Sequence, residues 1–135
     1  MTIVIDSSAI VALALTDEDA AYAESVLDSL AVESAAVPML FWYEIRNVML
    51  QAERRNRISQ ADVNDFLNEL NQLAIRIDTT PNEAAVMSLA RTHNLTSYDA
   101  SYLELAIRSG GTLATLDKRL KAAAVSESVS VLPDP

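Results

Sequence analysis

The sequence predicts an α/β fold with a central, mostly parallel sheet. Short apolar runs rich in β-branched residues alternate with longer amphipathic segments, which is the pattern of α/β proteins. The run from Ile3 to Ile5 is apolar throughout, as expected of a central strand that is covered on both faces. Half of the 135 residues are hydrophobic, so we expect a single domain over residues 1–135 with a full core.

Strands are predicted where short apolar runs are bounded by polar or turn residues. Helical segments separate these runs, which favours parallel pairing. The predicted strands cover residues 3–5, 37–38, 74–77, 112–116 and 129–132.

Helices are predicted from apolar residues that recur every three or four positions and from residues typical of helix ends. Thr16 opens the second helix, Ser59 to Asp62 the fourth, and Thr80 to Glu83 the fifth, where Pro81 takes the first helical position. Gly110 and Gly111 end the sixth. The predicted helices cover residues 9–15, 17–30, 40–55, 59–73, 80–93, 96–110 and 118–123.

Composition excludes several kinds of functional site. The chain has no cysteine and one histidine, His93, so disulfides, thiolate metal sites and zinc sites with several imidazoles are excluded. Nothing in the sequence orients His93, and we do not expect it to be catalytic. Any bound metal is therefore expected to be a hard cation with oxygen ligands.

Hydropathy and the N-terminal residues indicate where the protein acts. The first residues lack the basic segment of a signal peptide. No apolar run approaches the roughly 18 residues of a membrane span. We therefore expect a cytoplasmic protein with no membrane partner.

The net charge of −9, from 10 basic and 19 acidic residues, disfavours a polyanionic partner unless basic residues gather locally. Two basic clusters occur, and each is either a nucleic-acid contact or a solvated helix end near the negative pole of a helix dipole. The clusters are Arg54, Arg55 and Arg57, and Lys118, Arg119 and Lys121.

Four acidic residues are expected to meet at one edge of the sheet. Asp6 and Asp117 follow predicted strands, and ligands of open α/β sheets bind beyond the carboxyl ends of the strands. Asp99 lies in the first turn of a helix, and Glu44 shares a polar helix stripe with Asn47. These positions predict a ring of carboxylates.

Such a ring requires compensation, because two carboxylates about 5 Å apart repel by about 3 kcal/mol at an effective dielectric constant of 20. Either the carboxyl groups take up protons, or Mg²⁺ or Mn²⁺ supplies positive charge. With two such ions, one activates a water for attack on phosphorus and the other stabilises the leaving oxygen. Thr115 shares a strand face with Asp117, so its hydroxyl is expected to reach a ligand held there.

Each acid also has an ordinary structural explanation. Asp6 and Asp117 are placed to cap helices, and Asp99 to be a first-turn acid. Glu44 lies among apolar residues, where a position at the rim of the core or an ion pair with Arg46 or Arg108 is the alternative. Four aromatic residues are candidates for stacking on nucleobases, although helical spacing favours core positions for them. They are Phe41, Trp42, Tyr98 and Tyr102.

Four segments, in this order and at this spacing, resemble the PIN-domain ribonucleases. They are residues 4–9 (VIDSSA), 44–47 (EIRN), 95–106 (LTSYDASYLELA) and 113–120 (LATLDKRL). The similarity is greatest to the VapC toxins of bacterial type II toxin–antitoxin modules, and it spans essentially the whole chain.

The resemblance implies a PIN-like three-layer α/β/α sandwich with about five strands and a metal-dependent endoribonuclease activity that uses Mg²⁺ or Mn²⁺. It implies Asp6, Glu44, Asp99 and Asp117 as catalytic and metal-binding acids. Thr115, Asn47 and Ser7 are the supporting polar residues. The implied partners are RNA, a second copy of the chain in a homodimer, and a cognate antitoxin that directs a basic or bulky side chain into the acidic pocket.

Two points stay open at this stage. Glu104, five residues after Asp99, is either a further ligand or a surface acid. A receiver-like phosphoacceptor domain is an alternative function, although it needs adjacent acids after the first strand, where Asp6 is followed by serines. A protein-interaction domain without chemistry requires all four acid placements to be accidental.

Overall fold

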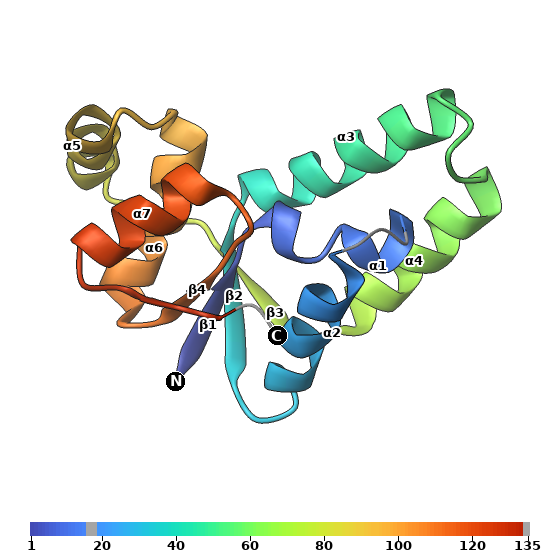
Figure 1. Cartoon of the computed structure of the whole chain (residues 1–135), viewed down its shortest axis with the longest axis horizontal. Helices are drawn as coiled ribbons and strands as arrows, with labels where there is room; N and C mark the ends of the chain where they lie inside the picture. The colour runs from blue at the N-terminus through green and yellow to red at the C-terminus, as the bar shows by residue number, and fades with distance from the viewer. Residues whose placement is uncertain (16–18, 134–135) are drawn as a thin grey trace.

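The computed structural model, which describes residues 1–15 and 19–133, contains a five-stranded sheet in the order β3-β2-β1-β4-β5 (Figure 1). Every neighbouring pair of strands is parallel. The strands are β1 (Thr2–Ile5), β2 (Ser34–Pro38), β3 (Ile75–Asp78), β4 (Thr112–Ala114) and β5 (Ser130–Val131). The predicted fold class is confirmed.

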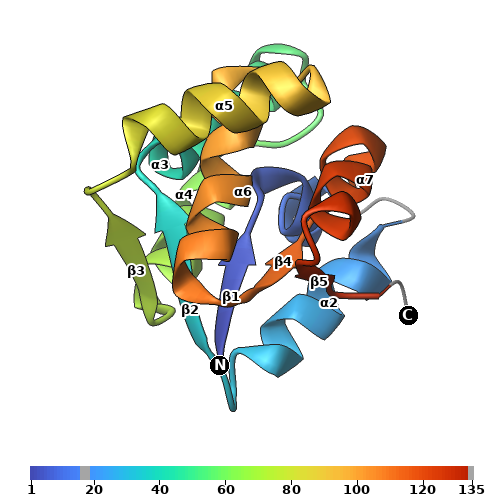
Figure 2. The ribbon, with the colours of Figure 1, turned by 90° about the vertical axis from the view of Figure 1, so that its left-hand side faces the viewer.

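Helices cover both faces of the sheet (Figures 1 and 2). A 3₁₀ turn, η1 (Ser7–Ala9), and four helices lie on one face, and three helices lie on the other, where α6 packs on β1, β2 and β4. The first group is α1 (Ala12–Leu15), α2 (Ala20–Ser29), α3 (Leu40–Arg54) and α4 (Gln60–Gln72). The second is α5 (Glu83–His93), α6 (Ser97–Ser109) and α7 (Lys118–Ser126).

The central position of β1 follows from its residues. Ile3, Val4 and Ile5 are buried, because the strand has a neighbour on each side and helices on each face. Its pairing with β2 and β4 aligns the carboxyl ends of the three strands at one edge of the sheet. Whatever follows these strands therefore meets at that edge.

Four helices begin at a side chain that accepts a backbone N–H from three residues ahead, which satisfies a donor that the helix leaves free. The capping residues are Ser59, Asn82, Thr96 and Asp117. The predicted start of α5 at Thr80, with Pro81 as its first helical residue, is wrong. The Asn82 side chain makes the cap, and Pro81 precedes the helix.

Some predicted boundaries differ from the structure. The expected helix over residues 9–15 is divided into η1 and α1. The strand expected over 112–116 ends at Ala114, because the Thr115 hydroxyl accepts the N–H of Asp117 and turns the chain. The predicted helix start at Thr16 lies outside the described residues.

The strand order bears on the alternative function. A receiver domain has the order 2-1-3-4-5, whereas β2 and β4 flank β1 here. The receiver alternative is therefore not favoured.

In the part of the chain that the structure describes, no helix is both long and apolar enough to cross a membrane.

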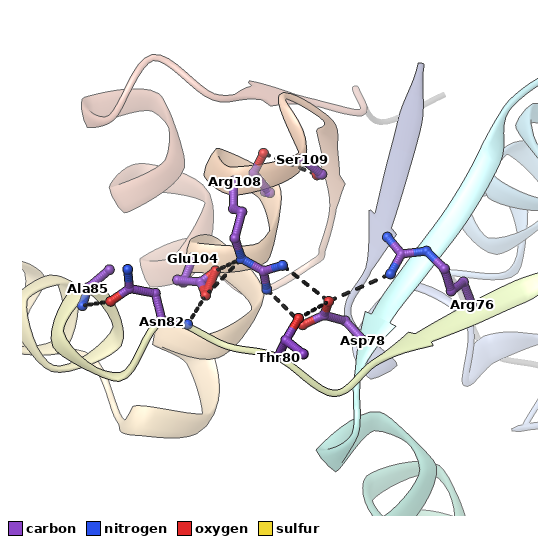
Figure 3. A network of polar contacts seen from close by, with 9 residues as sticks. Arg76, Asp78, Thr80, Asn82, Ala85, Glu104, Arg108 and Ser109 are labelled. Carbon is purple, nitrogen blue, oxygen red and sulfur yellow. Dashed lines mark hydrogen bonds and ion pairs between the residues drawn. The ribbon is translucent and has the colours of Figure 1, made fainter.

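A charged network joins β3, α5 and α6 on the side of the sheet shown in Figure 3. The Arg108 guanidinium donates two hydrogen bonds to the Asp78 carboxylate, at 3.1 and 2.7 Å, and its Nε donates to Glu104. Glu104 Oε1 also accepts the backbone N–H of Asn82 at 2.7 Å. Glu104 is 2% exposed, so its interpretation as a surface acid is wrong. Its hydrogen bonds to Arg108 and Asn82 give it a structural role.

We predict that Gly111→Ala lowers the free energy of unfolding by about 2 kcal/mol, because a methyl group there overlaps the carbonyl oxygen of Thr2. Gly110→Ala is the matched control. Gly110 has φ +63° with open space around it, so the change there costs only about 1 kcal/mol of backbone strain. Urea unfolding measures both values, and equal stability of Gly111→Ala and wild type would contradict the packing described.

We predict that Arg108→Met lowers the free energy of unfolding by about 3 kcal/mol, because it leaves the buried carboxylate of Glu104 without a counter-charge and that of Asp78 with only the exposed Arg76 at 3.6 Å. The hydrogen bonds from Arg108 lower the pKa of Asp78. Their stabilisation is therefore present at neutral pH and is lost as the pH falls below about 4, through the lowered pKa.

The control for this prediction is Arg76→Met. Arg76 is also an ion-pair partner of Asp78, but it is 61% exposed and 3.6 Å away, so its loss should cost at most about 1 kcal/mol. Urea unfolding at pH 7 and pH 3 measures the difference. A deficit for Arg108→Met that is small at pH 7, or unchanged at pH 3, would show that the network does not stabilise the fold through Asp78.

Candidate active site

Asp6 lies directly after β1 and forms the buried centre of the candidate site. Its backbone N–H bonds the Ala114 carbonyl, which continues the β1–β4 ladder by one residue. Its side chain makes no capping bond to η1, so the capping explanation for this acid is wrong. Asp6 is 6% exposed. Burial raises the pKa of its carboxyl group most, and the negative charge of Asp117 raises it further.

Two hydroxyl groups hold the Asp6 carboxylate. Ser8 Oγ and Thr115 Oγ1 each donate a hydrogen bond of 2.7 Å to Asp6 Oδ2. Ser8 Oγ also accepts the N–H of Leu116. The hydroxyls thereby connect the turn after β1 to the turn after β4, and they compensate part of the cost of burying the charge.

The position of Thr115 corrects one expectation. It was expected to share a strand face with Asp117, but both residues follow the end of β4. Its hydroxyl accepts the N–H of Asp117 at 3.0 Å and donates to Asp6. Thr115 therefore joins two of the acids, rather than reaching a ligand from Asp117 alone.

Glu44 lies in the second turn of α3 and is half-buried. Its Oε1 accepts a hydrogen bond from the hydroxyl of Tyr102 on α6. Burial, and then the charges of Asp6 and Asp99, raise the pKa of Glu44, while hydrogen bonds from Tyr102 and Ser7 oppose the rise. The alternative ion pairs are wrong, because Arg46 donates to Trp42 and Asn71, and Arg108 to Asp78 and Glu104.

Asp99 and Asp117 complete the set. The N–H of Asp99 bonds the capping hydroxyl of Thr96, which fixes this residue in the first turn of α6. Burial, and then the charges of Asp117 and Asp6, raise the pKa of Asp99. Asp117 Oδ1 accepts the N–H of Leu120 and caps α7, so for this residue the capping explanation is correct, and one carboxylate oxygen is engaged.

The structure thus brings together the four acids that sequence reasoning selected, close enough for their charges to act on one another. Within residues 1–15 and 19–133, no three acidic or imidazole side chains are already arranged to hold a metal ion. Hydroxyl and N–H donors engage Asp6, Glu44 and Asp117 instead. Coordination therefore requires these side chains to move closer together, but their oxygen donors and uncompensated charge fit a hard dication.

The supporting polar residues differ in their contacts. Ser7 contributes a side-chain hydrogen bond to Glu44. Asn47 is exposed, one turn along α3 from Glu44. Sequence reasoning did not assign Ser8 or Tyr102 to the site. Ser8 follows Asp6 by two residues. Tyr102 follows Asp99 by three residues, a spacing that places the side chains of Asp99 and Tyr102 on one face of α6.

The two basic clusters lie at different distances from the acids. Arg54, Arg55 and Arg57 are exposed at the end of α3, which runs away from the sheet edge in Figure 1. Arg54 is ten residues beyond Glu44, or about 15 Å along the helix axis. Lys118 and Arg119, both exposed, follow Asp117 directly and open α7.

Helix-dipole stabilisation explains only the first of these clusters. Arg54 is in the last turn of α3, where the dipole favours positive charge. Lys118 and Arg119 are in the first turn of α7, where the dipole disfavours it. Lys118 and Arg119 therefore lie at a solvated helix end, as the alternative explanation expects, but at the positive rather than the negative pole of the dipole.

The other candidates divide into core and surface residues. Phe41 and Tyr102 are buried, whereas Trp42 and Tyr98 are exposed. Arg46 lies 3.7 Å from the centre of the Trp42 ring. His93 Nε2 contacts Glu127 Oε2 at 2.8 Å, at the C-terminal end of α5.

Comparison with known proteins gives a consistent result. The family model described as PIN domain matches residues 3–126. Ribonuclease VapC3 from Pyrobaculum aerophilum is 32% identical over 123 residues, which cover 89% of this chain and 92% of that protein.

Two solved structures are similar in fold. The crystal structure of PAE2754 from Pyrobaculum aerophilum has a TM-score of 0.68 and 27% identity, and the match covers 91% of this chain and 84% of that one. VapBC2 from Rickettsia felis, bound to a DNA fragment from their promoter, has a TM-score of 0.65 and 14% identity, with 98% of each chain covered.

Proposed function

This chain belongs to the PIN domain family, as the four sequence segments predicted, and we propose that it is a metal-dependent endoribonuclease of VapC type. One observation carries the proposal. Acidic residues from four separate segments meet at the carboxyl edge of the sheet, where burial and mutual repulsion raise the pKa values of Asp6, Glu44 and Asp99. Ribonuclease VapC3, a relative over most of the chain, supports RNA as the substrate.

The four acids are the residues that would hold the metal, and the single proposed domain covers residues 1–135. Mg²⁺ or Mn²⁺ bound there would supply a nucleophilic water and stabilise the leaving oxygen of a phosphodiester. Ser8 and Thr115 orient the Asp6 carboxylate through two hydrogen bonds. Because these donors belong to turns after two different strands, the orientation of Asp6 depends on the packing of the sheet.

Lys118 and Arg119 are proposed to bind phosphates on either side of the cleaved bond. They begin α7 immediately after Asp117, and a phosphate there would offset the unfavourable interaction with the helix dipole. Arg54, Arg55 and Arg57 are proposed to bind RNA farther along the strand. At about 15 Å from Glu44 they lie beyond the reach of a very short RNA.

The proposed partners follow from the same site and the family. A cognate antitoxin and assembly as a homodimer are proposed from the similarity to VapC proteins, and the fold shared with VapBC2 supports the antitoxin. A basic antitoxin side chain would be attracted to the acids that hold the metal, so inhibition and catalysis would compete for one site. The RNA substrate implies action in the cytoplasm.

We predict that Asp99→Asn lowers Mg²⁺- or Mn²⁺-dependent RNA cleavage by at least 100-fold while the Tm of the metal-free protein stays the same or rises by a few degrees. The amide removes a charge that Asp117 and Asp6 repel. The gain in Tm should shrink as the pH falls through the raised pKa of Asp99, because the wild-type carboxyl group then becomes neutral. Gel assays of end-labelled RNA and thermal unfolding measure the two effects.

Asp65→Asn is the matched control, since Asp65 is an exposed acid on α4. It should cleave RNA at the wild-type rate, and EDTA should abolish cleavage by both proteins. Cleavage by Asp99→Asn at the wild-type rate would show that the site is wrong. Cleavage by the wild-type chain in EDTA would show that the metal requirement is wrong.

We predict that the two basic clusters respond differently to RNA length. In the uncleaving Asp99→Asn background, replacing Lys118 and Arg119 by Ala should weaken binding of both a 4-nucleotide and a 20-nucleotide RNA by about tenfold. Each lost phosphate contact should reduce the salt slope of log K by about 0.7. Replacing Arg54, Arg55 and Arg57 should weaken binding of the longer RNA only.

Fluorescence anisotropy at several salt concentrations measures these affinities. An unchanged Kd after replacement of Lys118 and Arg119 would mean that this pair does not contact RNA. Equal weakening of both RNAs by the Arg54 cluster variant would contradict the proposed path along α3.

A further inference from the structure

Tyr102 is a buried polar residue that the proposed chemistry does not use. It lies in the middle of α6, is 0% exposed, and its hydroxyl donates to Glu44 Oε1 on α3. Glu44 itself is only half-buried and extends from a different helix. The contact is therefore a bridge between the two faces of the sheet, made at the carboxyl edge where the acids meet.

We propose that Tyr102 is a positioning residue that orients the Glu44 carboxylate for metal binding. The inference rests on the proposed function, because it assigns a role within the same site. A glutamate side chain has several rotatable bonds, so a carboxylate that must act in one orientation needs a fixed partner. With Oε1 held by the phenol, the Glu44 carboxylate is fixed to α6 as well as to its own helix.

The environment of Tyr102 keeps it a donor. A phenol has an ordinary pKa of about 10, and burial of the Tyr102 side chain disfavours its anion further. The hydroxyl therefore stays protonated at neutral pH and serves neither as an anionic ligand nor as a base.

The position of Tyr102 on α6 links it to a second acid. Asp99 lies three residues earlier on the same helix, so both side chains project from one face. One helix thus supplies an acid of the site and the group that holds the acid of α3.

The test is a double-mutant cycle on Mn²⁺ binding, measured by isothermal titration calorimetry on the full chain. Tyr102→Phe keeps the ring and removes the hydroxyl. We expect it to weaken Mn²⁺ binding at least tenfold in the wild-type background, the range found when outer partners of metal ligands are removed. In a Glu44→Ala background, the same change should alter the Kd less than twofold, because the carboxylate that the hydroxyl holds is gone.

Tyr43→Phe is the matched control. Tyr43 precedes Glu44 and is 64% exposed, so loss of its hydroxyl should leave Mn²⁺ binding unchanged. Circular dichroism is the control that checks whether each variant is folded. Unchanged affinity of Tyr102→Phe, or an equal loss with and without Glu44, overturns the inference. A wild-type chain that binds no Mn²⁺ contradicts the proposed function itself, and the role of Tyr102 falls with it.

Discussion

Burial of the Asp6 carboxylate at the end of the central strand is the constraint on which the site depends. The group lies where β1, η1 and the turn after β4 meet, and the hydroxyls of Ser8 and Thr115 provide its hydrogen bonds. These bonds reduce the cost of burial without supplying positive charge, and the pKa of Asp6 stays raised. The other acids are arranged around a charge that the described residues do not neutralise.

The Asp78, Arg108 and Glu104 network shows the opposite solution in the same molecule. There, an arginine between two buried carboxylates lowers the pKa of Asp78 and leaves each acid paired. In the candidate site, Asp6, Glu44 and Asp99 repel one another and their pKa values are raised. Arg108 therefore neutralises the two acids that stabilise the fold. The acids at the sheet edge have no such partner among the described residues, which fits a site that binds a cation.

Sequence reasoning found the features that local pattern determines. The apolar run at β1, the capping residues Ser59 and Thr96, and the acids after strands are all visible within a few residues. Contacts between distant segments were not predictable in this way. The bond from Thr115 to Asp6, the bond from Tyr102 to Glu44, and the pairing of Asp78 with Arg108 depend on how helices and strands pack.

The central claim is that carboxylates from four segments share a divalent cation at the carboxyl edge of the sheet. Anomalous diffraction at the manganese edge, from crystals of the full chain grown with Mn²⁺, tests it most directly. The account predicts an anomalous peak within about 2.5 Å of oxygens from Asp6 and at least one of Glu44, Asp99 and Asp117. Crystals saturated with Mn²⁺ that show no peak there, with the four carboxylates too far apart to share an ion, would contradict it.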